Sequence, residues 1–259
     1  MKDLFESAIL PGRLGVLWIG QGGFALKSHG SGTLVVDPYL SESADTDGNW
    51  PRLERIPVAP EELRLDYLAL THDHLDHTDP LAVPGIAKAN PEAPIIAPPA
   101  SAEHLIQLGV SPSRIIIAKP GCAIVFPRLT IHPVMAEHTE DSVGYVFDFV
   151  SSASTEAGPR VYITGDSEYN DQLAEQVRDF KPNILMVPIN GLWGNMTAAQ
   201  AAKLTAQIAP DEAIPMHYGM FSGNTADPKD YVDLLFKTDP SCRTRPVILE
   251  MNAYHEFCE

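Results

Sequence analysis

The chain has 259 residues, of which 44% are hydrophobic and 20% are charged, and its 34 acidic and 18 basic residues give a formal net charge of −16. A chain of this length can bury the core of one α/β domain, so we expect a single domain over residues 1–259. The acidic composition, without a cluster of Lys or Arg, argues against binding of nucleic acid. No run approaches the roughly 18 apolar residues of a membrane span.

The three cysteines, Cys122, Cys242 and Cys258, show no CxxC spacing. Neither a zinc knuckle nor a disulfide framework is therefore expected, and free thiols are typical of a reducing compartment. The segment 1–20 carries acidic residues and a Pro-Gly break where a signal peptide needs an unbroken apolar stretch. The sequence thus predicts a cytoplasmic protein with no membrane partner.

The first part of the chain is predicted to be rich in strands. Apolar runs at 14–19, 24–27 and 33–37 are separated by glycine-rich breaks, which predicts three strands in a meander. The polar, proline-rich stretch 41–60 is predicted to be a surface loop of the kind that borders a site. Further strands are predicted at 67–71, 94–97, 115–118, 123–126, 130–135 and 144–150, with helices at 80–90 and at 101–108, the latter capped by Ser101 and stopped at Gly109.

The second part of the chain alternates strands with helices after a small-residue turn at 151–159. Strands are predicted at 161–164, 184–187, 213–216 and 247–249, and helices at 168–180, 197–208 and 228–237. Thr197 is interpreted as the N-cap of the second of these helices. Two stacked sheets with helices outside accommodate this order, because each helix buries one stripe and each sheet one face.

The strongest chemical signal is the run of residues 71–77, Thr-His-Asp-His-Leu-Asp-His. Residues two apart at the end of a strand point the same way, so His72 and His74 can bind one ion. The following loop can turn Asp76 and His77 toward a second ion. Imidazole and carboxylate ligands together suit Zn, Mn or Fe, so the run predicts a metal centre.

Three later residues, His138, Asp166 and His217, each follow directly after a predicted strand. Taken alone, a histidine or aspartate in such a place is more often a packing, turn or surface residue. A pair of metal ions needs more ligands than residues 72–77 supply. We therefore expect these three residues to complete the site.

The HxHxDH pattern of residues 72–77 resembles the signature of the metallo-β-lactamase superfamily, and His138, Asp166 and His217 follow in the order of that family's remaining ligands. The resemblance covers essentially the whole chain. It implies an α/β fold, the αββα sandwich, in which two stacked mixed β-sheets are flanked by helices and the metals lie at one edge. The segments 20–24 and 35–38 also resemble the family's opening strands and its Asp-Pro turn.

Ligand roles follow from the resemblance, position by position. It implies a first metal site of His72, His74 and His138, a second of Asp76, His77 and His217, and Asp166 as the bridge. The cofactors implied are two divalent metal ions, Zn or Mn, with Fe as an alternative. Such ions share a water and lower its pKa toward neutrality, which supplies a nucleophilic hydroxide that Asp76 would help to orient.

Within the superfamily, the segments 188–191, 195–201 and 214–221 resemble the branch that contains L-ascorbate-6-phosphate lactonase. This implies hydrolysis of a small anionic ester or lactone, although the chain is shorter than expected for that enzyme. Asn190 and Tyr218 lie beside ligand-bearing loops and are further catalytic candidates, with a turn asparagine and a core tyrosine as the alternatives. Trp18, Trp50 and Trp193 either line a pocket or fill the core, and the sequence does not distinguish these two roles.

Two other functions stay open. The same metal constellation resembles that of phosphodiesterases, although the acidic composition argues against RNA as a substrate. Diiron oxidoreductases share the scaffold, but flavodiiron proteins usually have Glu in place of His74 and carry a flavodoxin domain for which this chain has no length. A vestigial site is disfavoured because all seven ligand positions are filled. The resemblance also allows a homo-oligomer.

Overall fold

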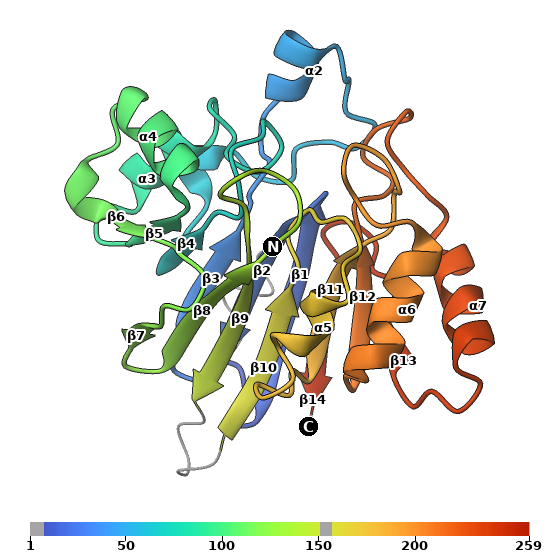
Figure 1. The fold of residues 1–259 in the computed structure, drawn as a ribbon. Coiled ribbons are helices and arrows are strands. Elements are labelled where there is room, and N and C mark those ends of the chain that lie inside the picture. The colour runs from blue at the N-terminus through green and yellow to red at the C-terminus, as the bar shows by residue number, and fades with distance from the viewer. Residues whose placement is uncertain (1–7, 151–156, 259) are drawn as a thin grey trace.

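The strands of the chain pair into two stacked sheets in the computed structural model, which describes residues 8–150 and 157–258 (Figure 1). Within these residues, each sheet has seven strands, in the orders β14-β1-β2-β3-β4-β5-β6 and β13-β12-β11-β10-β9-β8-β7. Helices cover the outer faces, so the αββα sandwich is confirmed. No helix in the described part of the chain is both long enough and apolar enough to cross a bilayer.

The first sheet begins as the predicted meander. Its strands are β1 (Arg13–Gly20), β2 (Gly23–Ser28), β3 (Gly32–Val36), β4 (Tyr67–Ala69), β5 (Ile95–Ala97), β6 (Ile115–Ile117) and β14 (Tyr254–Cys258). The pairs β14–β1, β1–β2 and β2–β3 are antiparallel, whereas the pairs from β3 to β6 are parallel. Parallel neighbours need crossovers, which here contain the helices α3 (Val83–Ala89) and α4 (Pro99–Gln107) and the short η2 (Pro112–Arg114).

The second sheet changes from antiparallel to parallel pairing along the chain. Its strands are β7 (Ile124–Phe126), β8 (Leu129–Met135), β9 (Val143–Val150), β10 (Ala157–Ile163), β11 (Ile184–Pro188), β12 (Glu212–Met216) and β13 (Arg245–Pro246). β7 to β10 are antiparallel and β10 to β13 parallel. The connecting helices are α5 (Gln172–Glu175), α6 (Ala198–Ile208) and α7 (Pro228–Thr238). Thr197 caps α6 with a capping box, as predicted.

Alternation along β1 builds two apolar layers. Val16 and Trp18 pack into the core between the sheets, whereas Leu17 and Ile19 point to the other face and pack in the cluster that contains residues of α3 and α4. Both faces of the first sheet are therefore buried, which stabilises its parallel part. This rigid pair of sheets carries the loops that follow the strand ends.

Some predicted elements were wrong in extent or place. Helix 168–180 is reduced to the single turn α5: before it the Glu168 N–H donates to the Glu137 carbonyl at 2.8 Å, and after it the Arg178 N–H donates only three residues back, to Glu175 at 3.2 Å. The predicted strand 247–249 is not formed; β13 is short and ends at Pro246, and β14 was not predicted. Of the predicted turn 151–159, residues 151–156 lie outside the described residues and 157–159 belong to β10.

Two boundaries also moved. The predicted loop 41–60 contains the short helix α2 (Ser43–Gly48) and leads to the turn η1 (Pro60–Glu62). α4 begins at Pro99, so Ser101 lies inside the helix rather than at its cap, and its hydroxyl accepts a hydrogen bond from Thr78 at 2.9 Å. Gly109 does adopt the left-handed φ of +89° that stops a helix.

Candidate metal centre

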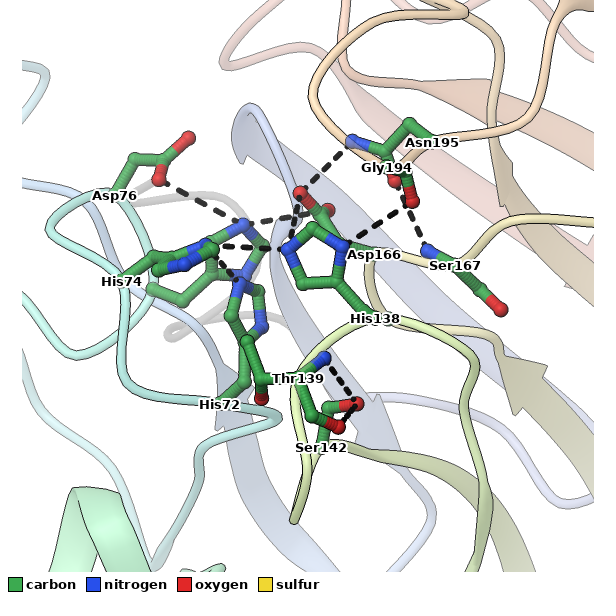
Figure 2. A network of polar contacts seen from close by, with 12 residues as sticks. His72, His74, Asp76, His138, Thr139, Ser142, Asp166, Ser167, Gly194 and Asn195 are labelled. Carbon is green, nitrogen blue, oxygen red and sulfur yellow. Dashed lines mark hydrogen bonds and ion pairs between the residues drawn. The ribbon is translucent and has the colours of Figure 1, made fainter.

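All seven predicted ligands follow the ends of strands, and these ends come from both sheets. Residues 72–77 follow β4 in the first sheet, while His138, Asp166 and His217 follow β8, β10 and β12 in the second. The loops meet at one edge of the sandwich, where the side chains turn toward one another (Figure 2). Residues from four distant parts of the polypeptide therefore form one cluster.

The first group contains three imidazoles. His72 Nε2 lies 2.9 Å from His74 Nδ1, and the same His74 atom lies 3.1 Å from His138 Nε2. One ring nitrogen from each residue lies within 4.8 Å of the other two. In Figure 2 these rings face a common point, with Asp166 behind them. This geometry can hold one metal ion.

The second group contains Asp76, His77 and His217. His77 Nε2 lies 3.3 Å from His217 Nε2, and the Asp76 carboxylate approaches these nitrogens to 3.9 and 3.7 Å respectively. The ligand atoms of this group also lie within 4.8 Å of one another. The arrangement provides a second place for a cation beside the first.

Asp166 lies between the two groups. Its Oδ1 is 3.0 Å from His217 Nε2 and 3.3 Å from His77 Nε2, and its Oδ2 is 3.9 Å from His138 Nε2. Oδ1 is buried and has no hydrogen-bond partner. A buried carboxylate oxygen in such a position needs a cation or a donor.

Hydrogen bonds at Nδ1 fix the tautomer in which two of the imidazoles would bind a metal ion. His77 donates from Nδ1 to Asp37 at 2.7 Å, and His138 donates from Nδ1 to the Gly194 carbonyl at 3.1 Å. With Nδ1 protonated, the neutral form of each ring presents the lone pair of Nε2 to the cluster. Lone pairs and carboxylate oxygens that converge in a buried site repel each other unless a cation lies between them. The cluster is therefore able to bind metal ions.

Electrostatics favour neutral imidazoles at three of the histidines and an ionised carboxylate at Asp166. Burial lowers the pKa of His72 well below its ordinary value, with His77 adding to the effect, and burial also lowers the pKa values of His74 and His138. Burial acts to raise the pKa of Asp166, but His217 and His77 outweigh it and hold that pKa well below its usual range. Neutral imidazoles and ionised carboxylates are the forms that bind metal.

His77 differs from the other histidines. Burial acts to lower its pKa, but the carboxylates of Asp166 and Asp37 outweigh burial and raise the pKa well above the ordinary value. Without metal, His77 therefore holds a proton that shares the charge of both carboxylates. Binding of a cation there would release this proton.

Three supporting residues were not assigned roles from sequence. Asp37 accepts from the Thr71 N–H at 2.8 Å and from the Thr71 hydroxyl at 2.6 Å, in addition to His77. Gln21 donates to Asp76 Oδ2 at 2.9 Å and lies 3.2 Å from His217 Nδ1. The sequence signals were the Asp-Pro turn and the glycine-rich break, but neither says which ligand its neighbour would hold.

Asn195 is the third supporting residue. Its Nδ2 donates to Asp166 Oδ2 at 2.8 Å, and its Oδ1 accepts from the Ser167 N–H at 2.9 Å. Figure 2 shows these contacts on the side of Asp166 where Gly194 meets His138. One loop, residues 191–195, thereby orients two of the predicted ligands.

Strained backbone gathers at this edge. The backbone φ angles of Gln21, Asp37 and His217 are 50°, 43° and 66°. Residues other than glycine rarely adopt this left-handed conformation. Each conformation costs on the order of 1 kcal/mol or more and persists where the surroundings enforce it. In this backbone conformation the three side chains reach the cluster.

The two further catalytic candidates have different surroundings. Asn190 donates from Nδ2 to Asn224 Oδ1 at 2.6 Å and so supports a residue of the pocket described below. The Tyr218 hydroxyl donates to the Leu249 carbonyl at 2.6 Å, and its ring centroid lies 4.5 Å from that of Trp18. These contacts favour a structural role for Tyr218, and a catalytic role for either residue stays a prediction.

A pocket of about 290 Å³ opens onto the cluster. One side is formed by His74, Asp76, Asp166 and His217. The other side is formed by Ala44, Trp50, Leu75, Trp193, Phe221 and Asn224. Trp50 and Trp193 therefore line a pocket, whereas Trp18 fills the core. A larger depression of about 690 Å³ is lined by residues in 171–183 and 207–211. Its lining contains no histidine and none of the predicted ligands.

Two stacked sheets with helices outside, and a histidine and aspartate cluster at their edge, define the class of metallo-hydrolases with the metallo-β-lactamase fold. A family model described as the beta-lactamase superfamily domain matches residues 33–218. A UPF0173 metal-dependent hydrolase of Aeropyrum pernix is 31% identical over 226 residues, covering 83% of this chain and 86% of the relative. Another, from Myxococcus xanthus, is 28% identical over 229 residues, covering 83% and 74%.

The fold comparison agrees. The structure of Igni18, a metallo hydrolase from Ignicoccus hospitalis, superposes with a TM-score of 0.72 at 20% identity, covering 95% of this chain and 98% of that one. The chain therefore belongs to the β-lactamase superfamily and, within it, to the UPF0173 metal-dependent hydrolase family. The finer resemblance to the L-ascorbate-6-phosphate lactonase branch is not confirmed by these relatives.

Proposed function

We propose that this metal-dependent hydrolase uses two divalent ions, Zn or Mn, to cleave a carboxylic ester or lactone. The observation that carries the proposal is the position of Asp166, whose two oxygens face one ligand group each. A carboxylate shared in this way supports a dinuclear site rather than two independent ones. The buried Oδ1 without a hydrogen-bond partner adds support.

The residues have the following roles in this proposal. His72, His74 and His138 would hold one ion, Asp76, His77 and His217 would hold the other, and Asp166 lies where it could serve both. When bound, the ions supply a water of lowered pKa as the nucleophile and a Lewis acid for the substrate oxygen. Asp37, Gly194 and Asn195 fix the ligand side chains, so the ligands need little rearrangement to bind the ions.

Asp76 has a second task. Its Oδ2 accepts a hydrogen bond from Gln21, and its Oδ1 would accept a hydrogen bond from the attacking water and so orient it. The side chain is 19% exposed and lines the pocket, so it lies where the cluster and the substrate meet.

The predicted anionic group of the substrate receives no support from the pocket. Within the described residues, no Lys or Arg side chain lines it, and its ionisable groups outside the histidines are Asp76 and Asp166. Without a Lys or Arg in this lining, the negative charge of a phosphodiester would be met by the metal ions alone. We therefore retain the ester or lactone and leave the anionic group out of the proposal.

Hydrolysis before and after metal removal tests the proposed function. Protein treated with a chelator should lose activity on simple esters and lactones, and added Zn or Mn should restore it. The variant His72→Ala should stay inactive after reconstitution, whereas His29→Ala, which changes a histidine in the turn between β2 and β3, should respond as the wild type does. Equal rates for metal-free and loaded protein, or faster cleavage of a phosphodiester than of any ester or lactone, would overturn the proposal.

A further inference from the structure

Three aromatic side chains form one side of the pocket beside the metal cluster: Trp50, Trp193 and Phe221, together called the aromatic wall. The ring centroids of Trp50 and Trp193 lie 6.0 Å apart, edge to face, and those of Trp50 and Phe221 lie 6.3 Å apart. These distances are within the range of attractive aromatic pairs. The wall is thus a continuous apolar surface made from three separate loops.

Trp193 lies outside the hydrophobic core. It is 68% exposed, which is unusual for the largest apolar side chain. Its backbone has a left-handed φ of 55°, a strained conformation for a bulky residue. An exposed ring held at such a cost points to a binding role.

The loop that carries Trp193 is fixed to the metal cluster. The Gly194 carbonyl accepts from His138 Nδ1 at 3.1 Å, and the Gly191 N–H donates to the Met196 carbonyl at 2.9 Å. Gly194 has a φ of +80°, and a Cβ there would lie 2.8 Å from His138 Nδ1, so the close approach requires glycine. The wall and the ligands therefore keep a set position relative to each other.

The charges around the wall do not suit an anion. Within the described chain, the pocket lining contains no cationic side chain other than its histidines, and it contains the carboxylates of Asp76 and Asp166. Arg52 belongs to the same loop as Trp50, but it donates to the Tyr39 carbonyl at 2.9 Å and stacks over the Tyr39 ring at 4.6 Å. This guanidinium is engaged in holding the loop and does not line the pocket.

We propose that the aromatic wall is a substrate subsite that takes a flat, uncharged, apolar group next to the bond that is cleaved. This inference rests on the proposed function and specifies its substrate class: an uncharged ester or lactone with an aromatic or similarly flat portion. A volume of about 290 Å³ suits a small molecule of this kind. Asn224 supplies the uncharged polar side chain of the lining, and Asn190 orients its amide.

Paired substrates test the subsite in the metal-loaded protein. A neutral aromatic lactone such as dihydrocoumarin should have a higher kcat/KM than a phosphorylated sugar lactone, by about tenfold or more, because only the former gains the apolar contact. Trp193→Ala should raise KM for dihydrocoumarin by about three- to tenfold with little change in kcat, the size expected for the loss of one aromatic contact. Trp193→Phe should restore most of the affinity.

A matched control separates the wall from general loss of surface aromatics. Phe236→Ala removes a side chain that is 43% exposed on α7 and outside the pocket lining, and it should leave KM unchanged. Circular dichroism of each variant checks the fold. A phosphorylated lactone as the better substrate, or Trp193→Ala with an unchanged KM, would overturn the subsite while leaving the proposed hydrolysis intact.

Binding without turnover distinguishes failure of the function from failure of the subsite. Of the three tryptophans, Trp18 is buried in the core, whereas Trp50 and Trp193 line the pocket. The uncleavable ketone 1-indanone should therefore quench tryptophan fluorescence of the wild type, and the quenching should weaken in Trp193→Ala. Quenching without hydrolysis of any ester or lactone would support the subsite and refute the proposed function. Absence of quenching would refute the subsite.

Discussion

His77 donates from Nδ1 to Asp37 Oδ2 across 2.7 Å, and both side chains are fully buried. The same carboxylate accepts from the backbone and the hydroxyl of Thr71, the residue just before the HxHxDH run. One aspartate at the end of β3 thus fixes the tautomer of a ligand and the start of the ligand-bearing loop. Contacts of this kind commonly tune metal sites.

Removing the charge of Asp37 should weaken metal binding. Asp37→Asn cannot accept from His77 and both Thr71 donors equally well, so we expect a loss of metal affinity of about 10- to 100-fold. Competition with a chromophoric chelator measures it. Asp66→Asn is the control, because Asp66 also accepts a backbone N–H, from Thr33 at 2.7 Å, at the opposite end of β3. Unchanged affinity in Asp37→Asn would contradict the assigned role.

Gln21 should matter for the second ligand group alone. Gln21→Ala removes the donor to Asp76 Oδ2 and the contact with His217, so the ion held by the second group should dissociate about tenfold more readily. Gln176→Ala is the matched control: its amide bonds both backbone groups of Met135 at the end of β8, which carries none of the second-group ligands. Isothermal titration of the metal-free proteins measures both. Equal losses in the two variants would point to general destabilisation instead.

The variant Tyr218→Phe distinguishes a structural role of the Tyr218 hydroxyl from the predicted catalytic role. The change removes the hydroxyl that donates to the Leu249 carbonyl and leaves a buried acceptor without its partner. We expect a decrease of about 1 kcal/mol in the free energy of unfolding, with no loss of kcat/KM. Urea denaturation and steady-state kinetics measure the two quantities. A large fall in kcat with stability retained would restore Tyr218 as a catalytic residue.

The buried carboxylate of Glu212 should make the stability of the fold sensitive to acid. Glu212 of β12 accepts from His255 of β14 at 2.7 Å and from Arg245 of β13. Burial acts to raise the pKa of Glu212, but these two partners outweigh it and lower the pKa. The folded state therefore holds this proton less tightly than the unfolded state does. The stabilisation is complete above about pH 4.3 and is lost as the pH falls through the lower folded pKa.

Melting temperatures of the metal-free protein between pH 3 and pH 7 test this sign. The wild type should lose stability toward the acid end of that range, and Glu212→Gln should be less stable at pH 7 with a shallower acid dependence. The exposed Glu175→Gln should follow the wild type. A wild-type stability that rose on acidification below pH 4.3 would show that the sign is wrong.

Much of the fold could be predicted because local patterns coincide with tertiary structure. Apolar runs between glycines gave the meander β1 to β3, and the capping residue Thr197 gave the start of α6. β14 could not be found, because its pairing partner β1 lies more than 230 residues away in sequence. Only one turn of the helix expected at 168–180 forms: Glu168 bonds to the Glu137 carbonyl, and the Arg178 N–H donates to Glu175 rather than to Ala174.

The site divides in the same way. The ligands follow strand ends in residue types that bind metals, so their convergence was predictable from the sequence and its family resemblance. Gln21 contacts Asp76 and His217 through its side chain, and Asn195 contacts Asp166, but no spacing in the sequence reveals such partners. The net charge of −16 describes the whole chain and likewise did not predict which side chains line the pocket, because these come from a few loops. A single domain, a cytoplasmic location and a homo-oligomer stay predictions.

Metal stoichiometry is the most direct test of the claim that Asp166 joins two ligand groups. Elemental analysis after equilibrium dialysis against Zn or Mn should give two ions per chain for the wild type and for His29→Ala. Asp166→Ala should retain fewer than one, because both ions lose a shared ligand. Two ions retained equally by Asp166→Ala, or none bound by the wild type at micromolar metal, would contradict the account.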